Sequence, residues 1–276
     1  MNRQKLIIST IIILAFPILG ISQINYGSNN GKYLTIRGTK IYYEEYGIGT
    51  PLLLLHGGFG SIADFKKCIP ELSTKYRVII PDAPGLGRSE NADSLMSYQL
   101  MEIYYSQMID LLKLDSAYVM GWSDGGIVAL LLGQSRPDKI KKVISSGPNY
   151  RADGLKEDEI DFVKNKLCNI EWVETNLKEW VENYTLLSPQ DDWKRYIKES
   201  KRMWFEKEYF PKSVLEEIRI PVIIVYGDND MYKLEHGIEI HRAIKNSQLC
   251  VLPNTSHNVY EEKPELIDQI AIDFFK

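Results

Sequence analysis

Continuous apolar runs of strand length recur along this chain, and they constrain its fold more than any other feature. Segments of helical length separate most of them. Strands that are apolar throughout are buried on both faces, which is typical of parallel sheets covered by helices. The spacing therefore predicts an α/β fold in which strands and helices alternate. The runs are Leu52–Leu55, Tyr76–Pro81, Ala117–Met120, Ile140–Ser145, Pro221–Tyr226 and Gln248–Leu252.

Two alternating segments near the start, Tyr33–Arg37 and Lys40–Tyr46, flank Gly38-Thr39 and predict a β-hairpin. With the six apolar runs, the hairpin completes a mostly parallel sheet of eight strands flanked by helices. The helices are expected at Ile62–Ser73, Tyr98–Leu112, Ser123–Gln134, Lys233–Lys245 and Glu262–Phe275.

The pattern changes between residues 148 and 211, where the sequence is charged, rich in tryptophan and without a buried strand. A helical insertion before the last two strands would cover the C-terminal edge of the sheet and act as a lid over a site there. The chain therefore divides into an α/β core, residues 23–147 and 212–276, and a lid, residues 148–211.

Residues 1–22 have the pattern of a signal peptide. Arg3 and Lys5 precede an apolar run, Leu6–Ile21, and the small residues Gly20 and Ser22 lie at −3 and −1 of a cleavage site before Gln23. The run is shorter than the ~20 apolar residues of a spanning helix. We therefore expect export to the periplasm or the medium and no stable membrane span after cleavage, with an uncleaved signal anchor as the alternative.

Composition narrows the possible partners. The formal net charge is -4, which argues against nucleic acid as a partner. The only dense basic stretch, Lys194–Arg202, alternates with acidic and apolar residues, which is typical of a solvated helix face. The histidines lack metal-ligand spacing and no phosphate or dinucleotide loop occurs, so we expect neither a metal site nor a cofactor. The three cysteines are interpreted as buried thiols. The oligomeric state is left open.

The segment Gly121-Trp122-Ser123-Asp124-Gly125-Gly126 lies between an apolar strand and a predicted helix. It matches Gly-x-Ser-x-Gly, the nucleophile elbow, in which a serine occupies a sharp turn and flanking glycines avoid collisions. A Gly-rich turn whose serine is only the N-cap of the helix would have the same sequence pattern. Ser123 is the candidate nucleophile.

The general base and the acid follow from position. Chains with such an elbow carry nucleophile, acid and histidine in that order. His236 and His241 fall within a predicted helix, whereas His257 follows the last strand in a loop that can reach the sheet edge. In Gly227-Asp228-Asn229-Asp230, Asp228 suits an Asx turn, so Asp230 is the candidate that orients His257.

Oxyanion donors are expected from two backbone positions, the amide of Asp124 and an amide of the loop His56-Gly57-Gly58-Phe59-Gly60. Gly58 is preferred, with Phe59 as the alternative, and His56 is interpreted as structural. Phe59 and Trp122 are expected to line an apolar substrate pocket. The Asp124 carboxylate either pairs with an ammonium group of the substrate in this pocket, or is an acid at a helix N-terminus that the helix dipole stabilises.

With these motifs and the turn Asp82–Ser89, the chain from Tyr33 to its last helix resembles the α/β-hydrolase family. Its elbow is similar to that of the valacyclovir-hydrolase (biphenyl hydrolase-like) group, which would imply esters bearing an amine. The resemblance implies hydrolysis of a small ester, thioester or amide through an acyl-enzyme. Family members with a carboxylate nucleophile, the dehalogenases and epoxide hydrolases, are disfavoured because Ser123 stands in that place. A carbon–carbon bond hydrolase, a cofactor-free haloperoxidase and a non-catalytic binding protein of this fold are the alternatives.

Overall fold

The structure is a computed structural model that describes residues 25–27, 31–207 and 209–276. The predicted signal peptide, residues 1–22, lies outside the described residues. Among the described helices, none has the length and apolar character required to cross a membrane.

The centre of the molecule is an eight-stranded sheet in the order β1-β2-β4-β3-β5-β6-β7-β8. β1 and β2 form the predicted hairpin, β2 also runs antiparallel to β4, and the remaining pairs are parallel. The predicted mostly parallel sheet is therefore confirmed. The strands are β1 Lys32–Ile36, β2 Thr39–Tyr46, β3 Thr50–Leu55, β4 Tyr76–Pro81, β5 Ala117–Trp122, β6 Ile140–Ser146, β7 Val222–Gly227 and β8 Ser247–Leu252.

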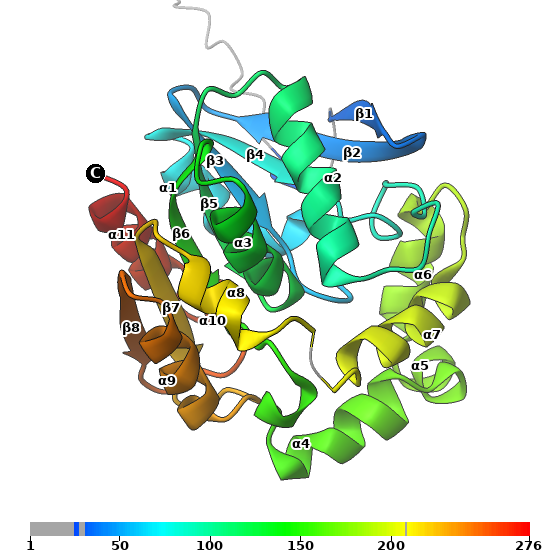
Figure 1. Ribbon diagram of the computed structural model, residues 1–276. Coiled ribbons are helices and arrows are strands. Elements are labelled where there is room, and N and C mark those ends of the chain that lie inside the picture. The colour runs from blue at the N-terminus through cyan, green and yellow to red at the C-terminus, as the bar shows by residue number, and fades with distance from the viewer. Residues whose placement is uncertain (1–24, 28–30, 208) are drawn as a thin grey trace, which may run out of the picture.

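Helices cover both faces of the sheet (Figure 1). One face carries α2 (Tyr98–Leu111), α3 (Asp124–Ser135), α8 (Lys212–Glu217) and α9 (Leu234–Ala243). The other carries α1 (Ile69–Leu72), α10 (Val259–Glu262) and α11 (Pro264–Phe274). Each face has its own cluster of buried apolar side chains, as a sheet buried on both sides requires.

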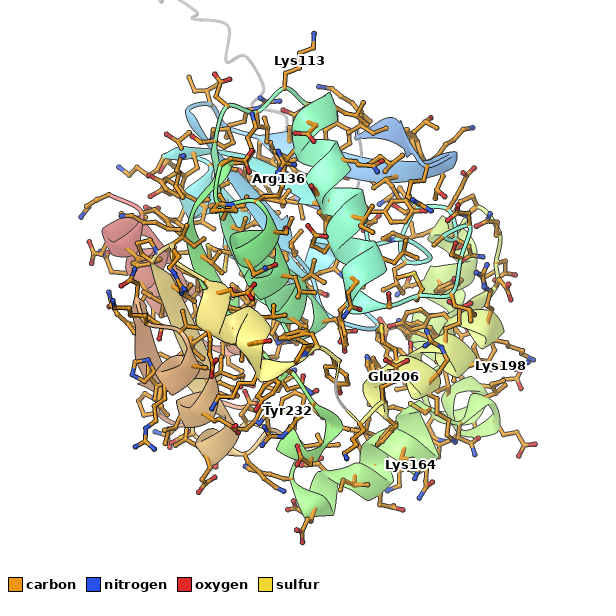
Figure 2. The ribbon with its side chains drawn as sticks, viewed as in Figure 1. Lys113, Arg136, Lys164, Lys198, Glu206 and Tyr232 are labelled. Atoms are coloured by element: carbon orange, nitrogen blue, oxygen red, sulfur yellow. The ribbon has the colours of Figure 1, made fainter. Side chains whose placement is uncertain are left out.

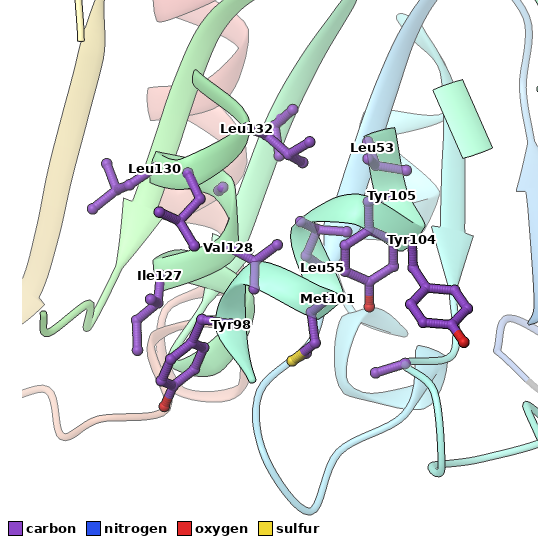
Figure 3. Close-up of a cluster of buried hydrophobic side chains, with 14 of the residues drawn as sticks. Leu53, Leu55, Tyr98, Met101, Tyr104, Tyr105, Ile127, Val128, Leu130 and Leu132 are labelled. Atoms are coloured by element: carbon purple, nitrogen blue, oxygen red, sulfur yellow. The ribbon is translucent and has the colours of Figure 1, made fainter. Parts of the chain in front are cut away.

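Helix α3 is buried on nearly every side, from Asp124 to Gly133. Figure 3 shows Val128 of α3 beside Leu55 of β3, with Tyr105 of α2 next to Leu55. Full burial of such an aliphatic side chain is worth about 1.5–3 kcal/mol. The helix that follows Ser123 is thus firmly held, which fixes the position of Ser123 itself.

Two predicted helices are interrupted, and a proline explains each interruption. Ile62–Ser73 divides into the 3₁₀ turn η1 (Ile62–Phe65) and α1, with Pro70 in the first turn of α1. Glu262–Phe275 becomes α10 and α11, with Pro264 at the start of α11. Proline lacks an amide hydrogen and clashes with the preceding turn, so it begins a helix more readily than it continues one.

The segment from Pro148 to Pro211, hereafter the lid segment, lies between β6 and β7 and is helical. In Figure 1 its helices gather at one end of the molecule, and Figure 2 shows its residues Lys164, Lys198 and Glu206 far from Lys113. The backbone of Lys156 donates to Met231 O, which ties this segment to the loop after β7. Its elements are η2 Ala152–Gly154, α4 Glu157–Asp161, η3 Phe162–Leu167, α5 Ile170–Asn176, α6 Lys178–Leu187 and α7 Trp193–Trp204.

Candidate active site

Ser123 occupies a strained turn between β5 and α3. Its φ is 54° and its ψ is -120°, a left-handed conformation that L-residues rarely adopt. Its amide donates to Ser146 O at 2.8 Å. At Gly125 an added Cβ would come within 2.1 Å of Leu55 O, so the helix can approach β3 only with glycine there. These features hold the serine side chain at the C-terminal edge of the sheet.

Asp230 and His257 meet at the same edge, brought there by the loops after β7 and β8. Nδ1 of His257 lies 2.8 Å from Oδ1 of Asp230. The Asp230 side chain is only 1% exposed and the His257 side chain 16% exposed. The amide of Tyr232 also donates to Oδ1, at 3.1 Å, and helps to fix the carboxylate. The acceptor on Nδ1 favours the tautomer that leaves Nε2 free to take a proton.

Ser123 and His257 line one cavity of about 350 Å³. The hydrogen bonds of the described residues include the His257–Asp230 pair but none between Ser123 and His257. Such hydrogen bonds are often long in ligand-free sites and shorten when a substrate binds. The three predicted triad residues are therefore gathered at one site, with two of them in direct contact.

The second aspartate of the acid loop has a different environment. The carboxylate of Asp228 accepts hydrogen bonds from the amides of Asn254 and Thr255, both at 3.0 Å. It thereby joins the acid loop to the loop that carries His257. These backbone hydrogen bonds lower the pKa of Asp228.

The other three histidines, all within the described residues, are not among those that line this cavity. His56, whose pKa is lowered by burial, has Nδ1 at 2.8 Å from Gly57 O and accepts from the amide of Ala83 through Nε2. His236 and His241 both lie on α9; burial lowers the pKa of His236 to about 4. Within residues 25–27, 31–207 and 209–276, no group of three His, Cys, Asp or Glu side chains could hold a metal ion.

Gly58 and Asp124, the two proposed oxyanion residues, line the same cavity as Ser123. Asp124 begins α3, where the first amides have no partner within the helix. Gly58 lines the cavity, and a Cβ there would come within 2.5 Å of Trp204 and 2.8 Å of the Asp124 carboxylate. The amide of Phe59 instead donates to the hydroxyl of Tyr196 at 2.7 Å. Of the two candidates in this loop, Gly58 is thus the one whose amide is not held by Tyr196.

The Asp124 side chain faces the cavity and the lid segment rather than solvent, and it is 6% exposed. Tyr98 donates to it at 2.8 Å and the Trp204 indole donates at 3.1 Å. Burial raises the pKa of Asp124, while these two donors and His257 oppose the rise. No Lys or Arg is among the described residues that form a hydrogen bond or ion pair with this carboxyl group, so its observed donors are all neutral.

The cavity wall is mainly apolar. Phe59 and Trp122 line it, and the Trp122 indole also donates to His257 O at 2.8 Å. The lid segment and the loop after β7 supply most of the remaining wall. Those residues are Ala152, Leu155, Val163, Leu167, Leu177, Trp180, Trp204, Phe205, Tyr209, Met231 and Tyr232.

The sequence reasoning did not identify Tyr98, Tyr196 or the role of Trp204 at Asp124. Tyr98 follows a serine N-cap and belongs to an apolar helical pattern, in which an aromatic residue is usually core. Tyr196 and Trp204 lie on α7, whose contacts with the core depend on how the lid segment packs. The tryptophan-rich composition of this segment was the only available signal.

The fold and this cluster of residues together define the class of the molecule, an α/β-hydrolase-fold protein with a serine at its elbow. Comparison with known proteins agrees. Residues 50–167 match the model of the alpha/beta hydrolase fold family. The chain is similar to hydrolase YugF of Bacillus subtilis, with 28% identity over 89% of this chain and 97% of the relative. Human serine hydrolase BPHL is 26% identical over 88% of this chain and 85% of its own length.

A further relative is the 2-hydroxy-6-oxo-6-phenylhexa-2,4-dienoate hydrolase of Burkholderia cepacia, 25% identical over 90% of this chain and 96% of that protein. Among solved structures, a bromoperoxidase from Bacillus anthracis has a TM-score of 0.76 at 22% identity, covering 89% of this chain and 99% of that one. The chain therefore has the α/β-hydrolase fold and is an enzyme, similar to these named hydrolases.

Proposed function

We propose that this enzyme is a serine hydrolase that cleaves a small ester, thioester or amide through an acyl-enzyme. Ser123 would attack the carbonyl, His257 would take its proton and later protonate the leaving group, and Asp230 would orient His257. The observation that carries the proposal is the 2.8 Å contact between His257 and Asp230 on the cavity that Ser123 lines. The left-handed backbone of Ser123 supports it.

In this proposal the developing oxyanion is stabilised by the amides of Gly58 and Asp124. Donors already in place at the site of charge development are worth about 10²–10³ in kcat each. The apolar wall excludes water from the acyl group and strengthens these hydrogen bonds. The substrate would accordingly present a compact, largely apolar acyl group.

The test is a panel of p-nitrophenyl acyl esters of graded length, with aminoacyl esters, assayed on the wild type and on Ser123→Ala. We expect turnover in the wild type and its loss in the variant, and labelling of Ser123 alone by a fluorophosphonate. Activity that survives Ser123→Ala would contradict the serine mechanism. Absence of both turnover and labelling in the wild type would favour a non-catalytic binding protein.

The Asp124 carboxylate favours a substrate that carries an ammonium group. A buried carboxylate with neutral donors only gains most from a cationic partner, because the pair replaces lost hydration. We expect Asp124→Asn to lower the ratio of aminoacyl-ester to plain-ester turnover by about tenfold, the equivalent of one charge-assisted hydrogen bond. An unchanged ratio would remove this part of the proposal.

A carbon–carbon bond hydrolase is less well supported. The related hydrolases of that kind are named for dienoate substrates, which carry a carboxylate. The described residues lining this cavity include no Lys or Arg, and they include the carboxylate of Asp124. A substrate carboxylate in this cavity would therefore meet a like charge without a cationic partner. A cofactor-free haloperoxidase would keep the same serine, and it is tested by halogenation activity in the same preparations.

A further inference from the structure

Phe59 follows the proposed oxyanion residue Gly58, and its backbone is strained. Its φ is 59°, in the left-handed region that a bulky side chain avoids. Such conformations cost of order 1–3 kcal/mol and persist only where the surrounding structure holds them. The residues that hold Phe59 can therefore be identified from its contacts.

Both backbone polar groups of Phe59 are bonded to side chains of the lid segment. Its amide donates to the hydroxyl of Tyr196 on α7 at 2.7 Å. Its carbonyl accepts from the Trp180 indole on α6 at 2.8 Å. Two different helices thus fix the two ends of one residue in the loop after β3.

The side chain of Phe59 is held by the same segment. Its ring centroid lies 4.6 Å from that of Trp180, 5.5 Å from Tyr196 and 5.9 Å from Trp204. The Tyr196 hydroxyl is also close to Gly58, at 3.2 Å from the position of an added Cβ. Aromatic pairs at these separations add stabilisation beyond the area they bury.

We propose that Tyr196 and Trp180 are positioning residues that hold the amide of Gly58 in the oxyanion hole. The peptide plane between Gly58 and Phe59 is rigid, so the bond to the Phe59 amide fixes the orientation of that plane. The orientation of the plane in turn restricts where Gly58 can direct its own amide. The lid segment thereby completes the catalytic site as well as covering it. The inference rests on the proposed serine hydrolase function.

The decisive variant is Tyr196→Phe, which removes only the hydroxyl that accepts from the Phe59 amide. Misplacement of a catalytic group by ~1 Å costs about 10²-fold in rate. The variant keeps the aromatic ring and its contacts with Phe59. We therefore expect a loss of about tenfold in both kcat and kcat/KM, with KM changed by less than about twofold. The reason is that a misplaced oxyanion donor weakens binding of the transition state and not of the substrate.

Tyr184→Phe is the matched control. Tyr184 lies on α6 and its hydroxyl donates to Gly85 O at 2.8 Å, so this variant also removes one hydrogen bond between the lid segment and the core. It leaves the Phe59 loop untouched, and kcat should stay within about twofold of the wild type. Trp180→Phe is the second test variant, because it removes the indole donor and retains an aromatic ring.

A boronic acid inhibitor, which forms a tetrahedral adduct on an active serine, separates positioning from general destabilisation. We expect Tyr196→Phe to lower the affinity for the boronic acid about tenfold, while the affinity for the matching carboxylic acid product stays unchanged. The inference is overturned if Tyr196→Phe keeps kcat within twofold of the wild type. Where Tyr196→Phe fails to fold, the same result for Trp180→Phe overturns it. It is also overturned if Tyr184→Phe loses as much activity as the test variant. If the wild-type enzyme shows no turnover, the proposed function is contradicted. Failure of the further inference can thus be distinguished from failure of the proposed function.

Discussion

Asp228 and Asp230 lie two residues apart in one loop, yet their carboxylates have different partners. Asp230 contacts His257, whereas Asp228 accepts from the amides of Asn254 and Thr255. An Asx residue of this kind stabilises a turn, while a buried carboxylate beside an imidazole selects its tautomer. The pair allows the catalytic and the structural contribution of this loop to be measured separately.

We predict that Asp230→Asn lowers kcat by about 10⁴-fold, the loss known when an amide imposes the wrong tautomer on a catalytic histidine. Asp228→Asn should lower kcat by less than about tenfold, because an amide oxygen still accepts one of the two backbone hydrogen bonds. Ester turnover and thermal unfolding of both variants provide the measurement. Equal losses of kcat in the two variants would exclude a special role for Asp230.

The sequence was informative for the triad candidates because their positions relative to the strands are fixed. Ser123, Asp230 and His257 each follow an apolar strand, and parallel strands end at a common edge. The partners Tyr98 and Tyr196 were not predictable in this way, because they reach the site from helices. Their contacts depend on packing angles that periodicity does not contain.

At the scale of elements, the six apolar runs and the two alternating segments of the hairpin together predicted every strand of the sheet to within about two residues at each end. Helix boundaries were less predictable near Pro70 and Pro264. A helical pattern of apolar residues continues across each proline, but the backbone hydrogen bonds cannot. Periodicity reports which face is buried, whereas continuity of a helix depends on the backbone.

Helix α11 contains a carboxyl group that should make stability depend on pH. The Asp268 side chain faces Cys68, is 4% exposed, and has an Oδ1 atom without a hydrogen-bond partner. Burial raises its pKa to about 7. A group whose pKa is higher in the folded state binds its proton more tightly there than in the unfolded chain. Its contribution to stability is therefore present at low pH and is lost as the pH rises from about 4 to about 7.

We predict that Asp268→Asn, which cannot ionise, becomes more stable relative to the wild type as the pH rises through that window. The free energy of unfolding in urea, measured for both proteins at about pH 5 and about pH 8, gives the difference. Asp273→Asn is the control, since Asp273 lies on the same helix in solvent beside Lys276. A difference between wild type and Asp268→Asn that is the same at both pH values would contradict the prediction.

At the scale of the whole molecule, the lid segment and the core depend on each other. The core provides Ser123, Asp230 and His257, while α6 and α7 provide Trp180, Tyr196 and Trp204. Hydrogen bonds run from the lid segment to Phe59, which follows Gly58, and to Asp124, which carries the other proposed oxyanion amide. Opening of the lid segment would therefore change the site chemically as well as expose it to water.

The N-terminus sets where this enzyme would act, and its pattern makes a separate prediction. For the cleavage site that we propose before Gln23, Gly20 and Ser22 would occupy the −3 and −1 positions, which signal peptidase requires to be small. When the full chain is produced in a bacterium, we expect active enzyme in the periplasm or medium beginning at Gln23, as read by N-terminal sequencing. Ser22→Leu should block cleavage and leave the same activity bound to the membrane by residues 6–21.

The compartment in which the protein is found distinguishes a cleaved signal peptide from a membrane anchor and from a protein that is not exported. Wild-type chain that remains in the membrane with Met1 intact would establish the apolar run as an anchor, because a mainly apolar segment shorter than the bilayer, preceded by basic residues, can be accommodated where the bilayer thins. Full-length chain in the cytoplasm would contradict export. Since the catalytic residues all follow residue 55, removal of residues 1–22 should leave kcat unchanged in either case, and a purified chain that begins at Gln23 provides that comparison.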